Sequence, residues 1–521
     1  MKQSSTKKIV VLGGGITGLS AAYYAHQAAL QQHIPVEITL IENSGRLGGK
    51  IHSVRSEGFL IEKGPDSFLA RKQPILDLTS ELGMEEQLVP TNPKAGSAYI
   101  LHKKKLHQMP MGLVLGIPTR ISPFIRTGLI SPLGKARAVL DMVLPARKTD
   151  EDEALGDFIE RRLGREVLEQ MTEPLLAGIY AGDTRSLSLL STFPQFRQME
   201  KKHHSLIIGM ARNMLRRPAR HASAKPNKAS ASRHRQAFSG TSSSGQPHAK
   251  PKAKSMFLSY RHGLSAIIDR LQEQLIRDQV NLRMEQKVIR ITANEHAHWA
   301  AEPQATRDQV EGNHRYNLIL SNGEQLSADS IICTIPAYAA AGLFQDVPGI
   351  SELNRIHYVS VANIALGYKH HQLQHEFEGT GFLVPRKENR MITACTWSST
   401  KWSHTAPSDQ TLLRTYIGRA GAEEWTDMSD EQLVQAVRHD LRDLIGFDAE
   451  PDLVEISRCY RSMPQYPVGH GELMGRVRAS LAAHLPGVLL CGAGYGGIGI
   501  PDCVQHGREA AEQIVSRLAA N

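Results

Sequence analysis

The stretch that decides the fold reads IVVLGGGITGLSAAY at residues 9–23 and TLIENSGRLGGK at residues 39–50. An apolar strand leads into a glycine turn and a helix of small residues, and a second strand ends in Glu42, about 24 residues after Gly18. A glycine turn alone is a weak signal, because such turns are common. With a strand before it, a helix after it and an acid at this distance, it predicts a βαβ unit that binds a dinucleotide.

Each glycine of the turn has its own physical task. Gly13 permits the tight turn, Gly15 lets the backbone approach a pyrophosphate, and Gly18 lets the helix pack close to the strand. The pyrophosphate is expected to lie on free N–H groups at the positive end of the helix. Glu42 is expected to bind the ribose hydroxyls and to repel a 2′-phosphate, which disfavours NADP. The other residues assigned to the nucleotide here are Gly14, Ile16, Thr17 and Asn43.

Two further glycine segments refine the cofactor from a dinucleotide to FAD. Residues 45–50 read GRLGGK, which is similar to the Arg-x-Gly-Gly segment that follows the ribose acid in two-domain FAD oxidases. Residues 492–502 read GAGYGGIGIPD before a helix whose N-terminus can stabilise negative charge on the reduced flavin. One motif could bind NAD, whereas three at these places favour FAD. The cofactor residues predicted from these segments are Arg46, Gly48, Gly49, Gly492, Ile500, Pro501 and Asp502.

The composition is that of an ordinary globular chain with more than one domain. Its 521 residues are 41% hydrophobic, and no apolar run is long enough to span a membrane. The N-terminus runs directly into the nucleotide strand without the apolar core of a signal peptide. The five cysteines are scattered without a CxxC pair, which argues against a disulfide framework and against a zinc site. We therefore expect a cytoplasmic protein without a metal site.

The formal charge of +9 is concentrated in one segment. Residues 216–254 contain ten Lys/Arg and no acid, and the rest of the chain holds 51 basic and 52 acidic residues. The body is therefore nearly neutral, which argues against nucleic-acid binding. The segment has few large apolar residues and is predicted to be a disordered surface loop, with an electrostatic tether to anionic lipid as the alternative.

The predicted fold class is α/β: a discontinuous Rossmann-like FAD domain with a mixed α+β substrate domain and a helical subdomain. Strand patterns at 288–291, 316–320 and 330–335 are expected to return to the nucleotide sheet, and a helix is expected at 501–518. The assignment gives 1–90, 255–335 and 450–521 to the FAD domain, 91–120 and 336–449 to the substrate domain, 121–215 to the helical subdomain and 216–254 to the basic insert.

Five motifs, four of them outside the glycine segments, resemble the protoporphyrinogen/coproporphyrinogen oxidases of haem synthesis. They are EKGPDSF at 62–68, EPLLAGIYAGD at 173–183, STFPQF at 191–196, MPQY at 463–466 and GIPD at 499–502. The resemblance covers nearly the whole chain except the basic insert. It is strongest to the Gram-positive bacterial branch, which oxidises coproporphyrinogen III to coproporphyrin III. It implies an FAD-dependent amine oxidase-like fold, non-covalent FAD, O2 as the electron acceptor and H2O2 as a product.

This chemistry explains why no catalytic triad, acid/base pair or metal cluster stands out, and no catalytic side chain is assigned. Aromatisation of a porphyrinogen removes six electrons, so a two-electron flavin needs three cycles while the protein positions the ring. By resemblance, Gly178 and Ile179 lie against the porphyrinogen in front of the flavin. Arg71 and Lys72 are candidates to pair with propionates, and a solvated surface is the alternative.

The remaining site residues come from the same resemblance. The turn Gly64, Pro65, Asp66 and Ser67 is assigned to the cofactor, because an ionised Asp66 cannot bind a propionate. Val288 is expected to contact adenine through its backbone. Cys459 stands near the flavin where close members of the family often carry Trp, so its packing role is open.

Several alternatives remain at this point. The substrate could be protoporphyrinogen IX, or the chain could be another FAD enzyme such as an amine oxidase or a carotenoid desaturase. A flavin- or porphyrin-binding carrier that turns over little is a further reading. Two further hypotheses are hand-over of product to the downstream haem-pathway enzyme and peripheral membrane contact through the apolar loops at 113–144.

Overall fold

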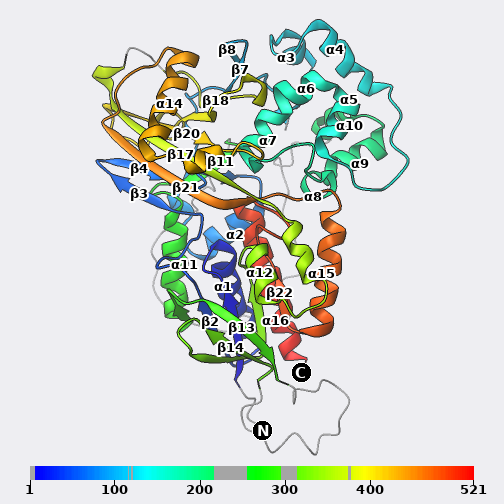
Figure 1. Ribbon diagram of the computed structural model, residues 1–521, viewed down its shortest axis with the longest axis vertical. Helices are drawn as coiled ribbons and strands as arrows, with labels where there is room; N and C mark the ends of the chain where they lie inside the picture. Colours follow the sequence, from blue (N-terminus) through cyan, green and yellow to red (C-terminus); the bar gives the residue numbers. More distant parts are fainter. Residues whose placement is uncertain are drawn as a thin grey trace, which may run out of the picture.

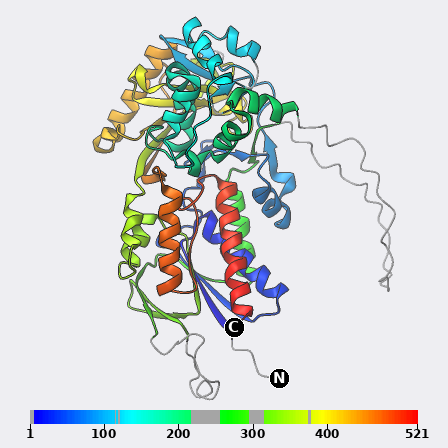
Figure 2. The ribbon, with the colours of Figure 1, turned by 90° about the vertical axis from the view of Figure 1, so that its right-hand side faces the viewer.

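The computed structural model describes residues 6–114, 116–118, 121–215, 255–294, 314–373 and 377–520. The chain forms two halves (Figure 1). The lower half in that view is a parallel sheet covered by helices, and the upper half places a larger sheet beside a group of helices. Figure 2 shows the same division from the side. The predicted basic insert lies outside the described residues.

The parallel sheet forms from buried apolar strands whose two faces are both covered. Ile9 and Val11 pack on one face and Val10 and Leu12 on the other. Helices α1 (Ile16–Gln31), α11 (Ser265–Arg277) and α16 (Ile500–Ala519) cover the first face. The strand order is β12-β2-β1-β16-β22, with β1 at Lys7–Leu12, β2 at Val36–Ile41, β12 at Asn281–Arg283, β16 at Ser330–Cys333 and β22 at Val488–Leu490.

One part of the sequence prediction for this half is wrong. Strands β13 (Val288–Ala293) and β14 (Tyr316–Leu320) do not return to the parallel sheet, but pair with β15 (Gln325–Ala328) in a separate antiparallel sheet. The alternating burial along β14 fits a sheet with one covered face. Only β16, the third predicted strand, joins the nucleotide sheet, and β22 adds outside it.

The larger sheet has seven strands in the order β21-β17-β20-β19-β18-β7-β8. Helix α14 (Asp430–Ile445) packs its apolar side on it and begins with a capping box at Ser429. Strand β21 pairs with β17 here, which differs from the sequence-based boundary at residue 450. The strands are β7 Tyr99–His102, β8 Lys105–Gln108, β17 Tyr358–Lys369, β18 Gly381–Leu383, β19 Ile392–Trp397, β20 Gln410–Ile417 and β21 Leu453–Pro464.

The helical subdomain packs around its own apolar core beside this sheet. The sequence also has helical patterns at 155–163 and 166–176: the first matches α5, whereas the second is interrupted by a π-helical turn at Leu168–Thr172. The helices are α3 Ile121–Arg126, α4 Pro132–Val139, α5 Leu155–Leu163, α6 Arg165–Val167, α7 Glu173–Tyr180, α8 Leu189–Thr192, α9 Pro194–His203 and α10 Leu206–Leu215.

Short elements connect these parts. The hairpin of β3 (Ser53–Ser56) and β4 (Phe59–Glu62) leads toward the turn at residues 64–67.

Among the described residues, no helix has both the length and the apolar character to cross a bilayer. The other elements are β5 Phe68–Leu69, β6 Leu88–Pro90, β9 Leu113–Val114, β10 Ile117–Pro118, β11 Phe257–Tyr260, α2 Gln73–Glu81, α12 Ala337–Leu343, α13 Ser398–Lys401 and α15 His470–His484.

Candidate functional site

The three glycine segments meet at the N-terminus of α1. The amide of Gly48 donates to the carbonyl of Gly14 at 2.8 Å, and a Cβ built on Gly49 would lie 3.2 Å from the Cα of Gly15. A Cβ on Gly492 would lie 3.1 Å from Oγ1 of Thr17. Segments more than 400 residues apart in the chain therefore line one site, as the sequence predicted.

The glycine turn leaves an open space in front of the helix. Gly13 has φ 104°, and a Cβ on Gly18 would lie 1.8 Å from the carbonyl oxygen of Gly13, so neither position tolerates a side chain. A Cβ on Gly15 would meet no atom within 4 Å. Backbone N–H groups at a helix start that border an open space fit the pyrophosphate of a dinucleotide.

Glu42 stands directly after β2 at the edge of this space. Its Oε2 accepts from the amide of Gly14 at 2.7 Å, and its Oε1 accepts from the amide and hydroxyl of Ser44 at 2.8 and 2.7 Å. These hydrogen bonds hold the carboxylate in place where a ribose is expected. The carbonyl of Glu42 accepts from Gln286, which places Val288 nearby, while Asn43 is exposed.

The Arg46–Lys50 loop contains a residue that the sequence reasoning missed. Arg46 folds back and donates to carbonyls of its own loop, including that of Gly49 at 2.5 Å. The ammonium of Lys50 donates to the carbonyl of Ser462 on β21 and so joins the cofactor loop to the substrate sheet. Burial lowers the pKa of Lys50. The only signal in the sequence was its place directly after the glycine pair.

The turn at residues 64–67 is fixed to the substrate sheet through Asp66. Its carboxylate binds Nζ of Lys401 at 2.8 Å, and it accepts from Oγ of Ser67 at 2.6 Å. Burial alone raises the pKa of Asp66, but Lys401 and Arg414 outweigh it and hold that pKa below its usual range. Arg414 also donates to the carbonyl of Gly64. The Asp66 side chain thus links the two halves of the protein. Contact of the cofactor with the turn, including Pro65, stays a prediction.

The two cations proposed for propionates differ in their surroundings. Lys72 forms an ion pair with Asp502 at 2.7 Å, at the start of α16 beside Ile500 and Pro501. Arg71 is exposed. The structure therefore gives Lys72 a partner within the protein and leaves the substrate role of both as a prediction.

The residues proposed to lie against the substrate are near the C-terminal end of α7. Ile179 is 40% exposed although it is a large apolar residue, and a Cβ on Gly178 would meet only Leu383, at 3.8 Å. Ala181 ends the helix in the left-handed region, and Gln465 donates to the carbonyl of Tyr180 at 2.8 Å. An apolar surface at this place can accept a flat hydrophobic ring.

Strand β21 ends between helix α7 and the cofactor loop, since Gln465 contacts Tyr180 and Ser462 contacts Lys50. Cys459 lies opposite Val361 and is partly buried, and burial raises the pKa of its thiol. Lys50 and Arg414 exert the opposite effect and so are near the thiol. A small neutral side chain therefore stands beside the lysine that enters from the cofactor loop.

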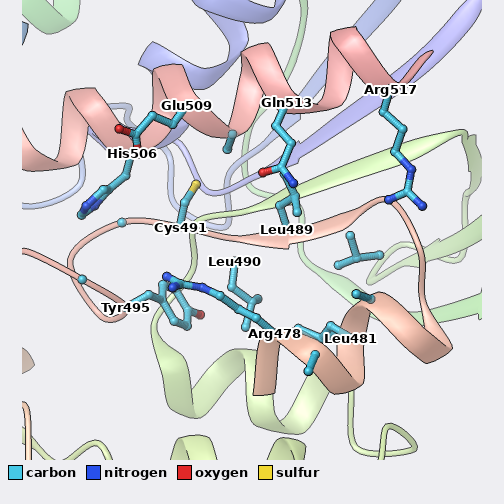
Figure 3. Close-up of a pocket in the computed structure, with 17 residues that line it drawn as sticks. Arg478, Leu481, Leu489, Leu490, Cys491, Tyr495, His506, Glu509, Gln513 and Arg517 are labelled. Atoms are coloured by element: carbon cyan, nitrogen blue, oxygen red, sulfur yellow. The ribbon is translucent and has the colours of Figure 1, made fainter. Parts of the chain in front are cut away.

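A cavity of about 500 Å³ lies behind the third glycine segment, between α15 and α16 (Figure 3). Arg478 comes from α15, His506 and Glu509 come from α16, and strand β22 forms the floor. It contains Gly492, but not the residues of the first two glycine segments. It is therefore separate from the space in front of Gly15.

Comparisons with known proteins support a flavin cofactor. The family of flavin containing amine oxidoreductases matches residues 16–515. The coproporphyrinogen III oxidase of Bacillus subtilis is 42% identical over 98% of both chains, and that of Staphylococcus aureus is 34% identical over 98% of this chain and all of its own. A crystal structure from Exiguobacterium, named as a protoporphyrinogen oxidase, superposes with TM-score 0.79 at 36% identity, covering 98% and 99% of the two chains.

Proposed function

The chain belongs to the flavin containing amine oxidoreductase family, and we propose that it oxidises coproporphyrinogen III to coproporphyrin III with O2. The observation that carries this proposal is the similarity to coproporphyrinogen III oxidases over 98% of the chain. The site supports it, because three glycine segments fit FAD and an apolar surface lies at the end of α7. The cofactor is FAD, which the family and the glycine geometry both indicate.

The reaction removes six electrons and six protons from one porphyrinogen, and three O2 become three H2O2. Bound FAD supplies the two-electron oxidation that is repeated three times. The residues of the chain then have to hold the macrocycle against the ring system, exclude water and admit O2. Ile179 and Gly178 offer the apolar contact, and Gln465 fixes the end of their helix.

Protoporphyrinogen IX is the second candidate substrate. The name of the Exiguobacterium structure favours protoporphyrinogen IX, whereas the names of the relatives from Bacillus subtilis and Staphylococcus aureus favour coproporphyrinogen III. The two substrates differ because two propionates of coproporphyrinogen III are vinyl groups in protoporphyrinogen IX. A site with an additional cation therefore favours coproporphyrinogen III.

The test is oxidation of each porphyrinogen by the purified FAD-loaded protein, followed by porphyrin fluorescence, O2 uptake and H2O2. We expect three H2O2 per porphyrin and a higher kcat/KM for coproporphyrinogen III. Stoichiometric porphyrin binding without turnover above the enzyme-free blank would instead support a carrier. Turnover of amines alone would support an amine oxidase.

We also propose peripheral membrane contact through the exposed apolar residues around α4. Leu133 on α4 is 84% exposed and Val143, four residues after this helix, is 77% exposed, while Lys135 lies on α4 with Leu133. Apolar side chains beside a cation fit a lipid interface. Flotation with anionic liposomes tests this: the wild type should float, and a Leu133→Ser/Val143→Ser variant should not. Equal flotation of both proteins contradicts the assignment of this surface.

A further inference from the structure

Four arginines are buried in the described residues, and one of them differs from the others. Arg162 donates to Asp141 and to several carbonyls, Arg197 to Glu200 and two carbonyls, and Arg414 to Asn363 and the carbonyl of Gly64. Arg419 is 5% exposed, yet its guanidinium has no hydrogen bond or ion pair with any described residue. Its nitrogens are not among the atoms that are both fully buried and without a partner, so they face open space.

The neighbours of Arg419 do not balance its charge. Arg386 donates to Oε1 of Glu173 at 3.0 Å and to the carbonyl of Ala420, so the nearby acid already has a cation. Burial, and then Arg386, lower the pKa of Arg419 to about 10, which leaves it protonated at neutral pH. The cluster of Arg386, Arg419 and Glu173 therefore carries a net positive charge in a largely buried place. An isolated buried charge is costly unless a partner compensates it.

The backbone places this charge along the helix that carries the proposed substrate surface. The amide of Ala420 donates to the carbonyl of Ala181 at 2.7 Å, directly after α7, while Arg386 reaches Glu173 at the start of that helix. Gly418 has φ 93°, and a Cβ there would lie 2.6 Å from the carbonyl of Ser360. The turn that presents Arg419 is thus fixed against α7 and the substrate sheet.

We propose that Arg419 binds a ring carboxylate of the porphyrinogen and thereby favours a tetrapyrrole with additional propionates over one with vinyl groups. The inference rests on the proposed function and names a specificity-determining residue for it. A carboxylate supplies the charge and the acceptors that the guanidinium lacks, and an arginine can bind it with two parallel hydrogen bonds. A vinyl group at the same place leaves the cation unpaired.

The test measures binding of the product by fluorescence titration to FAD-loaded wild type, Arg419→Met, Arg419→Lys and the exposed control Arg476→Met. For Arg419→Met we expect about 10- to 100-fold weaker binding of coproporphyrin III, from the loss of a charge-assisted hydrogen bond. Binding of its tetramethyl ester, which carries no negative charge, should change little. Arg419→Lys should recover part of the loss, and Arg476→Met should behave as wild type.

Kinetics provide the second readout. In Arg419→Met, KM for coproporphyrinogen III should rise more than KM for protoporphyrinogen IX, so the ratio of their kcat/KM values should fall. Equal losses for both substrates, or for acid and ester, would mean that Arg419 is only structural and would overturn the inference while leaving the proposed function intact. A wild-type protein that neither binds nor oxidises a porphyrin overturns the proposed function and this inference together.

Discussion

The ion cluster inside the helical subdomain and the one beside α7 use buried arginines in opposite ways. Arg162 is fully buried and reaches the Asp141 carboxylate, with Glu200 3.6 Å away. Arg419 is almost as deeply buried and has no such partner. A charge with complete partners holds a fold together, whereas a charge without one costs stability and is available to a ligand. The predictions below test this difference, beginning with the largest effect.

The largest effect is expected when the cluster of Arg162, Asp141 and Glu200 loses Arg162. Arg162→Met leaves Asp141 buried without its cation, which should cost about 3–5 kcal/mol of unfolding free energy. Urea unfolding followed by circular dichroism measures this loss. The exposed Arg165→Met, which breaks a surface pair with Glu169, should cost at most about 1 kcal/mol. A loss below about 1 kcal/mol in Arg162→Met would mean that complete partners are not what makes a buried arginine structural.

The second prediction applies the same argument to the ion pair between Asp66 and Lys401, which links the two halves. Asp66→Asn leaves Lys401 largely buried and unpaired, so we expect a loss of about 2–3 kcal/mol at pH 7. The pKa of Asp66 is lower in the folded protein, so its contribution is complete above the unfolded pKa and disappears as the pH falls through the folded one. The difference in the free energy of unfolding between wild type and Asp66→Asn should therefore become smaller at acidic pH. Unfolding curves at pH 7 and pH 3.5 check this, and a constant gap contradicts it.

The third prediction concerns a buried acid that has hydrogen bonds but no cation in contact. Glu62 accepts from the amide of Leu264 and the hydroxyl of Ser53, and burial raises its pKa to about 7. Its folded pKa exceeds the unfolded one, so stability is lost as the pH rises through 7. Between pH 5.5 and pH 8 the free energy of unfolding of Glu62→Gln should fall by about 1–2 kcal/mol less than that of the wild type. Thermal unfolding at the two pH values measures it, and an unchanged slope counts against this origin.

The nucleotide site could be predicted from the sequence, because its tasks depend on local backbone geometry. Gly13, Gly15 and Gly18 lie within one turn: the positive φ of Gly13 and the close approach of Gly18 to the carbonyl of Gly13 require glycine, and Gly15 borders the open space. The assignment of β13 and β14 failed, because an alternating strand pattern does not say which sheet the strand joins.

The charged residues beside α7 could not be predicted for a different reason. Arg386 and Glu173 come from distant parts of the chain, and nothing local distinguishes Arg419 from the other 60 Lys and Arg residues. Its lack of a partner is a property of the packed protein. The same holds for Lys50 and Ser462, which lie about 400 residues apart and meet only because β21 joins the substrate sheet.

The last prediction is the smallest in size and has the opposite sign. In the FAD-loaded protein without porphyrin, Arg419→Met removes a buried cation that has no partner, so the free energy of unfolding should stay the same or rise by up to about 2 kcal/mol. Arg414→Met provides the matched comparison, because that arginine is equally buried but donates to Asn363, and its loss should destabilise the protein by about 1–3 kcal/mol. Urea unfolding of both variants decides the matter. Equal destabilisation of the two would show that Arg419 has a structural partner after all, since only an unpaired charge can be removed without loss.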